Sequence, residues 1–137
     1  MASAIIDASI ASAWCFPDEQ TDYTKAVFLA VSSSAVDARA PRLLAYEIRN
    51  SVLMGVRRKR INRADAEEFL LALNDLNITF NEPVSYNAVF HLAEKHGLTV
   101  YDAAYLNLAL EEKLPLATLD RQLIDAAKKA GVTLLQP

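Results

Sequence analysis

The feature that most constrains this chain is an alternation of short apolar segments with longer segments of helical periodicity. Apolar runs of three or four residues predict buried strands at 4–6, 78–80, 116–119 and 132–135. The segments that predict helices are 9–15, 19–33, 43–59, 63–76, 84–96, 102–113 and 121–130. Strands that alternate with helices in this way form a mainly parallel sheet, so the chain is predicted to be an α/β protein.

The region from about residue 43 to residue 76 breaks the alternation with two successive helices. Pro41 marks a loop before the first helix, in which Leu44, Ile48, Val52 and Val56 recur every four residues. Asn62 is a plausible N-cap for the second helix. With 137 residues and no linker or repeat, the chain is expected to form one domain, 1–137.

Composition excludes several classes of protein. The formal net charge of −3 excludes a generally basic nucleic-acid coat, so any RNA-binding charge must be local. The single cysteine, Cys15, excludes an intramolecular disulfide and a multi-cysteine zinc site, which suits a reducing cytoplasm. No stretch approaches the roughly 18 apolar residues of a membrane span. A soluble, unsecreted, cytoplasmic protein is expected.

Three aspartates stand where predicted strands or loops end. Asp7 directly follows the first strand, Asp120 directly follows the strand at 116–119, and Asp102 opens a predicted helix. Sites in parallel α/β sheets form beyond the carboxyl ends of the strands, so at least two of these carboxylates should meet there. Taken singly, Asp102 and Asp120 could be helix N-caps and Asp7 a turn residue.

Glu47 lies within a predicted helix, on one stripe with Leu43, Asn50 and Met54. Its side chain could point into a cleft, although a solvated helix residue is the ordinary alternative. Several carboxylates brought together repel one another unless a cation or a raised pKa relieves the repulsion. Mg²⁺ and Mn²⁺ prefer such oxygen ligands and can activate water for phosphodiester hydrolysis. Ser9 and Thr118, each two residues from an aspartate, could orient these groups.

The only dense basic cluster is Arg57, Arg58, Lys59 and Arg60, at the end of the helix that carries Glu47. It is a candidate for phosphate contacts with RNA, in which case RNA affinity should fall when its arginines are replaced and should depend on salt. The alternative is that these residues favour the helix C-terminus through its dipole and solubilise a turn. Phe69, Leu70, Leu71 and Leu73 on the next helix supply either a wide core stripe or a surface for a partner.

Four segments in this order resemble a PIN domain, and specifically the VapC-type ribonuclease toxins of toxin–antitoxin modules. They are Ile6–Trp14, the Glu47-x-x-Asn50 pair, Tyr101–Ala109 and Thr118–Leu123. The resemblance implies a three-layer α/β/α sandwich around a central parallel sheet. It also implies an endonuclease, dependent on Mg²⁺ or Mn²⁺, that acts on structured RNA such as tRNA or rRNA.

The resemblance places Asp7, Glu47, Asp102 and Asp120 on the four acidic metal-binding positions of the family and Ser9 and Thr118 on its supporting polar positions. It further implies a homodimer and a small antitoxin that wraps over the helical region. Other readings keep the same acidic site for RNA maturation or single-strand DNA cleavage. A non-catalytic RNA- or protein-binding module would not need all four acids, and a phosphotransfer receiver would carry a pair of acids near the first strand.

Overall fold

A four-stranded, fully parallel sheet forms the centre of the computed structural model, which describes residues 2–137. The strands are β1 (Ala2–Ile6), β2 (Val36–Pro41), β3 (Thr79–Asn81) and β4 (Leu116–Ala117), in the spatial order β3-β2-β1-β4. The helices are α1 (Ala8–Cys15), α2 (Asp22–Ser32), α3 (Leu43–Arg57), α4 (Arg63–Asp75), α5 (Tyr86–His96), α6 (Val100–Glu112) and α7 (Arg121–Ala130), with a short 3-10 helix η1 (Pro17–Glu19).

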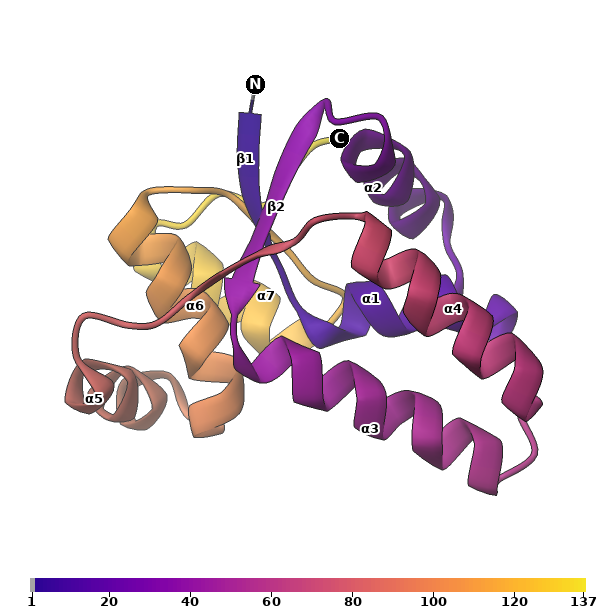
Figure 1. The fold of residues 1–137 in the computed structure, drawn as a ribbon. Coiled ribbons are helices and arrows are strands. Elements are labelled where there is room, and N and C mark those ends of the chain that lie inside the picture. Colours follow the sequence, from indigo (N-terminus) through magenta and orange to yellow (C-terminus); the bar gives the residue numbers. More distant parts are fainter. Residues whose placement is uncertain (1) are drawn as a thin grey trace.

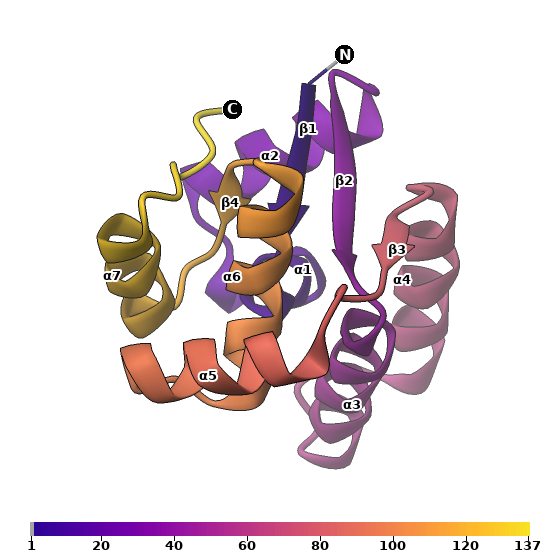
Figure 2. The ribbon, with the colours of Figure 1, turned by 90° about the vertical axis from the view of Figure 1, so that its left-hand side faces the viewer.

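Helices cover both faces of the sheet (Figure 1). Figure 2 shows α6 in front of the sheet and α2 behind it, with α5 packed beneath α6. Because both faces are covered, the central strand β1 can be apolar without alternation, and Ile5 and Ile6 are fully buried. Leu106 of α6 and Leu123 of α7 are also fully buried in this core. The predicted α/β/α sandwich is confirmed.

The strand β2 is missing from the sequence-based prediction, which placed a loop at Pro41. Its buried residues Ala38 and Ala40 have small side chains, and they alternate with the charged residues Asp37 and Arg39. Arg39 donates to Asp37 at 3.0 Å, and both side chains are partly exposed. Apolar periodicity therefore gave little indication of a strand. Pro41 is its last residue, where a missing N–H is tolerated.

Other predicted boundaries also need correction. The segment predicted as a final strand, 132–135, makes a single parallel bridge, from Leu134 to Leu116. The predicted helix 19–33 divides into η1 and α2, because Thr21 caps α2 in a reciprocal capping box with Thr24. The remaining helices lie within a few residues of their predicted ranges. Gly97 ends α5 in the left-handed conformation, as glycine commonly does.

Helices α3 and α4 form a hairpin that projects away from the sheet (Figure 1). Asn62 caps α4 by accepting from the backbone of Asp65, as predicted. The half of the hairpin nearest its turn packs on the end of α1, where Cys15 is buried with Phe16 and Val52. The apolar face of α4 is a wide core stripe, because Leu73 is buried and Phe69 and Leu70 pack against the core. Leu71 is its exception, with 67% of its surface exposed.

No helix within residues 2–137 combines the length and the apolar character that a bilayer crossing requires.

Candidate active site

Asp7 stands at the carboxyl end of β1 and is nearly inaccessible, with 4% of its surface exposed. It caps α1, because its Oδ1 accepts from the backbone N–H of Ile10 at 3.2 Å. Two hydroxyls also donate to it: Ser9 to Oδ1 at 2.6 Å, and Thr118 to Oδ2. Burial raises the pKa of Asp7 from its ordinary 3.8 to about 6, although the three hydrogen bonds oppose that rise.

Asp120 is held next to Asp7 by the same hydroxyl network. The strand β4 ends at Ala117, so Asp120 lies three residues beyond it and not directly after it as predicted. Thr118 Oγ1 accepts from the backbone N–H of Asp120 at 3.0 Å, and Ser9 Oγ accepts from that of Leu119 at 2.9 Å. Asp120 caps α7 as predicted, because its Oδ1 accepts from Leu123 N–H at 2.9 Å. Ser9 and Thr118 therefore join the two aspartates.

Asp102 does not cap its helix, contrary to one reading of the sequence. The helix α6 begins at Val100, and Thr99 is its N-cap, with Oγ1 accepting from the backbone N–H of Asp102 at 3.0 Å. The run before Asp102 is therefore a helix start and not the end of a strand. Because Thr99 performs the capping, the carboxylate of Asp102 has no capping role. Burial, and next the charge of Asp120, raise the pKa of Asp102.

Glu47 lies on the face of α3 beside the buried stripe of Leu44, Ile48 and Val52, and its side chain is half-buried. Its Oε1 accepts from the hydroxyl of Tyr105 at 2.5 Å. Burial raises the pKa of Glu47, the Tyr105 hydroxyl opposes that rise, and the charge of Asp102 adds to it. Asn50, one turn further along α3, is exposed.

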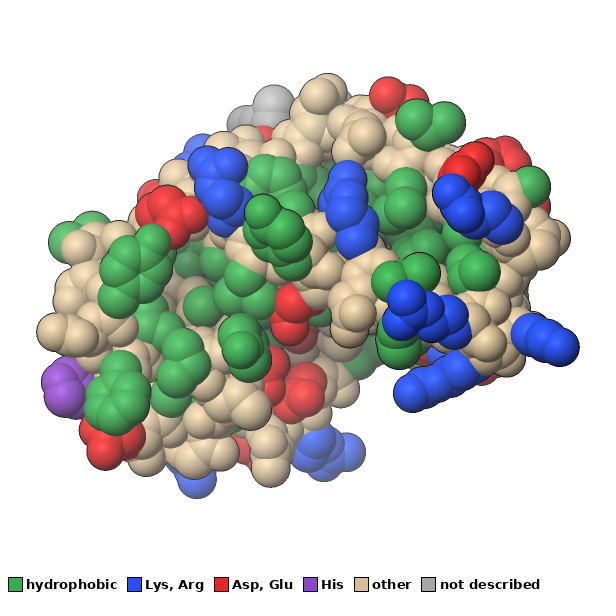
Figure 3. Space-filling model, turned by 60° about the horizontal axis from the view of Figure 1, so that its bottom comes forward, with side chains coloured by type: hydrophobic (Ala, Val, Ile, Leu, Met, Phe, Trp, Pro, Cys, Tyr) green, Lys and Arg blue, Asp and Glu red, His purple; other side chains and the backbone are tan. Residues whose placement is uncertain are grey.

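The structure brings all four acidic side chains to one region at the carboxyl edge of the sheet. Asp102 is the shared neighbour, because its charge raises the pKa of both Asp7 and Glu47 while the charge of Asp120 raises its own. Within residues 2–137, no Lys, Arg or His forms an ion pair with any of the four. In Figure 3, acidic side chains gather near the centre of this face.

The donor set fits a hard divalent cation in kind, because every candidate ligand is oxygen and the carboxylates have no cationic partner of their own. The side chains themselves lie apart: among residues 2–137, no three His, Cys, Asp or Glu side chains are close enough together to hold one ion. The arrangement therefore supplies the ligands and the mutual repulsion that a cation would relieve, without a closed coordination shell.

Comparison with known proteins shows the family of this chain. A profile of the PIN domain matches residues 4–129. This chain belongs to the PIN domain family. Ribonuclease VapC3 of Pyrobaculum aerophilum is 34% identical over 125 residues, which are 88% of this chain and 92% of that protein. The chain is thus a PIN-domain protein of the VapC type, as its four sequence motifs indicated.

Two solved structures share the fold. PAE2754 from Pyrobaculum aerophilum superposes with a TM-score of 0.72 at 24% identity, covering 91% of this chain and 84% of that one. VapBC2 from Rickettsia felis, bound to a DNA fragment from their promoter, gives 0.66 at 15% identity and covers 97% of both chains. At these identities the likeness concerns the architecture of the PIN domain.

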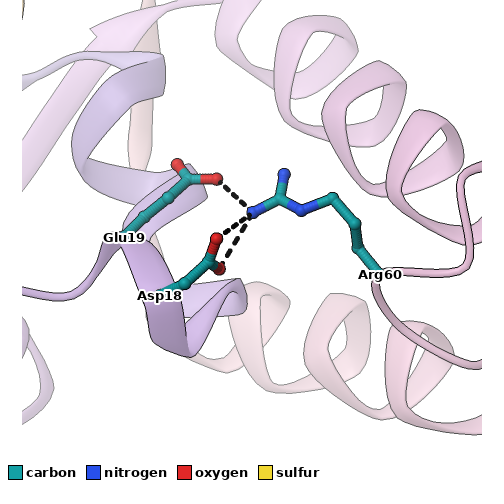
Figure 4. A network of polar contacts seen from close by, with 3 residues as sticks. All are labelled: Asp18, Glu19 and Arg60. Carbon is teal, nitrogen blue, oxygen red and sulfur yellow. Dashed lines mark hydrogen bonds and ion pairs between the residues drawn. The ribbon is translucent and has the colours of Figure 1, made fainter.

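The basic cluster at the end of α3 divides into two kinds of residue. Arg57, Arg58 and Lys59 are exposed, and none of the three forms an ion pair within residues 2–137. Arg60 differs, because its Nη2 contacts both carboxylate oxygens of Asp18, at 2.9 and 3.0 Å, and Glu19 Oε2 at 2.9 Å (Figure 4). Its guanidinium also lies 4.2 Å from the centre of the Phe16 ring. Arg60 thus ties η1 to the hairpin.

A wide groove of this PIN domain lies away from the four acids. It has a volume of about 780 Å³ and runs between the end of α1 and the α3–α4 hairpin. Trp14, Phe69 and Ile61 give it apolar walls, and Lys59 and Arg63 stand among its charged residues. None of the four acids lines this groove.

The sequence did not reveal the contact that Tyr105 makes at the site. It was placed in a buried helix, and it is 1% exposed. The available indication was its position three residues after Asp102, which puts both side chains on one face of α6. Nothing in the sequence showed that Glu47, 58 residues earlier, would receive its hydroxyl.

Proposed function

We propose that this PIN-domain protein is the toxin of a toxin–antitoxin module, an endoribonuclease that hydrolyses phosphodiester bonds of structured RNA such as tRNA or rRNA. The observation that carries the proposal is the gathering of Asp7, Glu47, Asp102 and Asp120 at the carboxyl edge of the sheet. The 34% identity to ribonuclease VapC3 supports RNA as the substrate. A site with four buried or half-buried acids repels an anionic substrate unless a cation stands between them.

The proposed cofactor is Mg²⁺ or Mn²⁺, held by the four acids. A bound ion of this kind supplies an activated water and stabilises the charge that develops on the phosphoryl oxygens. The residues of this chain orient the ligands: the hydroxyls of Ser9 and Thr118 hold the Asp7 carboxylate. We assign Asn50, exposed one turn from Glu47, to a supporting contact at the same surface.

The proposed RNA contacts are the exposed side chains of Arg57, Arg58 and Lys59, at the far end of the helix that carries Glu47. Along an α-helix, the eleven-residue offset from Glu47 to Arg58 corresponds to roughly 16 Å, the reach of a few nucleotides. In Figure 3, Lys and Arg side chains lie to the right of the central acidic group, over the projecting hairpin. Arg60 is the weakest member of this proposal, since its guanidinium already binds Asp18 and Glu19.

The proposed protein partners are a small antitoxin and a second copy of the chain. The groove between η1 and the α3–α4 hairpin suits a peptide segment of the antitoxin, because its walls are apolar and its rim is charged. A homodimer would cover part of the exposed apolar surface, which includes Tyr86 and Phe90 of α5. The structural relative VapBC2 from Rickettsia felis, bound to a DNA fragment from their promoter, supports an antitoxin as the partner.

The test is to express the chain alone and compare it with an Asp102→Asn variant. The wild type should arrest growth, and the variant should relieve the arrest. Purified wild type should cut RNA with Mg²⁺ or Mn²⁺, and the variant should be slower by more than about 100-fold, since even residues that support a metal site cost about 10–100-fold when changed. Asp75→Asn is the matched control, because Asp75 is an exposed carboxylate at the end of α4.

Other outcomes would redirect the proposal. RNA cleavage without growth arrest would favour a nuclease of RNA maturation. Absence of both cleavage and arrest, with RNA binding retained, would favour a binding module. Equal cleavage by wild type and Asp102→Asn would remove the acidic cluster from the mechanism.

A further inference from the structure

The side chain of Tyr105 projects from α6 to a carboxylate on a different helix. Its ring is fully enclosed, on a helix that packs directly on β1 and β2. Its hydroxyl donates to Glu47 Oε1 at 2.5 Å. Because only 1% of the residue is exposed, the ring cannot contact an RNA substrate, and the hydroxyl is the single part that reaches the acidic site.

The four acids differ in how their carboxylates are held. Asp7 and Asp120 cap helices, so backbone N–H groups of Ile10 and Leu123 fix them. Asp102 sits in the first turn of α6, close to its cap at Thr99. Glu47 lies in the second turn of α3, its side chain has one more rotatable bond than an aspartate, and its hydrogen bond comes from Tyr105. The orientation of Glu47 therefore depends on another helix.

We propose that Tyr105 is a positioning residue that holds the Glu47 carboxylate toward the other three acids, so that a divalent cation meets a preorganised ligand. The inference rests on the proposed function, because it presumes that Glu47 is a metal ligand. One helix then serves two ligands: α6 supplies Asp102 directly and orients Glu47 through Tyr105, three residues further on the same face. Groups that orient metal ligands in this way commonly contribute about 10–100-fold to metal affinity.

Tyr105→Phe tests this role, since it removes the hydroxyl and leaves the ring in the core. We expect Mn²⁺ affinity, measured by titration calorimetry on the intact chain, to fall about tenfold, with the circular dichroism spectrum unchanged. Tyr86→Phe is the matched control, because the Tyr86 hydroxyl also donates to a glutamate, Glu82, at 2.5 Å but on the exposed surface. That variant should bind Mn²⁺ like the wild type.

A double-mutant cycle separates positioning from a general loss of stability. If Tyr105 acts through Glu47, then Tyr105→Phe should cause no further loss of Mn²⁺ affinity in a Glu47→Gln background. Additive losses, or unchanged affinity in Tyr105→Phe alone, would overturn the inference. If Glu47→Gln and Asp102→Asn themselves leave Mn²⁺ binding unchanged, it is the proposed function that fails.

A second variant covers the case in which Tyr105→Phe does not fold. Glu47→Asp keeps the charge, leaves the core untouched and withdraws the carboxylate from the Tyr105 hydroxyl by one methylene. We expect this variant to lose at least about tenfold in Mn²⁺ affinity. Wild-type affinity in Glu47→Asp would show that the position of this carboxylate does not matter, and would contradict the inference.

Discussion

The carboxyl edge of the sheet is acidic, and the tip of the α3–α4 hairpin, residues 57–60, is basic. The two regions differ in whether side chains of opposite charge neutralise them. At the edge, Asp7 is buried and receives three hydrogen bonds, yet no cationic side chain within residues 2–137 pairs with it. At the tip, Arg60 is paired with Asp18 and Glu19, while Arg57 and Arg58 remain free of ion pairs in the described part of the chain.

The difference shows that the sequence alone does not reveal which charged residues find a partner of opposite charge in the fold. The acids at the edge are held without compensation of their charge, which burial makes costly and which a bound cation would relieve. The tip is partly neutralised by the chain itself, because Arg60 pairs with Asp18 and Glu19 and also lies over the Phe16 ring. Only the unpaired part of the tip is available for phosphate. Three experiments address this comparison, in addition to those on Asp102 and Tyr105.

The largest effect is expected from pH acting on Asp7. Its pKa is raised from 3.8 to about 6 in the folded protein, so between these values the folded state binds a proton that the unfolded chain has released. The free energy of unfolding of the metal-free protein should therefore fall as pH rises from about 4 to about 6, by up to about 3 kcal/mol.

Denaturant unfolding in the presence of a chelator, at several pH values, measures this fall. Asp7→Asn should reduce this fall and leave only the part that comes from the raised pKa values of Glu47 and Asp102. Asp75→Asn, which changes an exposed carboxylate, should retain the fall of the wild type. Parallel pH profiles for the wild type and Asp7→Asn would show that the charge of Asp7 is not destabilising at the edge.

The next effect concerns the junction between the hairpin and α1. A Cβ added at Gly55 would lie 2.6 Å from two atoms of the buried Phe16 ring. Gly55→Ala gains about 1 kcal/mol in helix propensity, but overpacking of a core costs about 1–3 kcal/mol. We expect a net destabilisation of about 1 kcal/mol in thermal or denaturant unfolding.

Ser51→Ala, one turn earlier on α3, provides the comparison, because it alters propensity at a half-buried position without adding volume. A Gly55→Ala variant that is more stable than the wild type would mean that Phe16 moves aside and that the hairpin is loosely attached.

The smallest effect separates the two kinds of arginine at the tip. In an inactive Asp102→Asn background, the Arg57→Ala, Arg58→Ala double variant should bind RNA about tenfold more weakly. The slope of its salt dependence should fall by roughly 1.4–1.8, because each lost phosphate contact contributes about 0.7–0.9. Arg60→Ala should change RNA affinity less than twofold and lower the melting temperature, because its guanidinium holds η1.

Asp18→Asn sharpens the distinction, since it frees part of Arg60 and should raise RNA affinity slightly at low salt. Fluorescence anisotropy with one RNA at two salt concentrations measures all of these variants. An Arg60→Ala loss as large as that of the double variant would place Arg60 in the RNA contact and contradict its structural assignment.

Much of this molecule was readable from local features of the sequence. Apolar patterning located β1 and the seven α-helices but not η1, and Asn62 and Gly97 marked helix ends. The ordered motifs around Asp7, Glu47, Asp102 and Asp120 pointed to the PIN family. These features are local because helix periodicity and capping depend on residues within a few positions of one another.

The tertiary structure decided what local patterns could not express. It placed a strand at Val36–Pro41, where small residues alternate with an ion pair, because β2 fills the gap between β1 and β3. In the structure, Thr99 and not Asp102 caps α6, and the Tyr105 hydroxyl donates to Glu47. The tertiary structure also paired Arg60 with η1. Each of these depends on which elements pack together, and packing joins residues that are far apart in the chain.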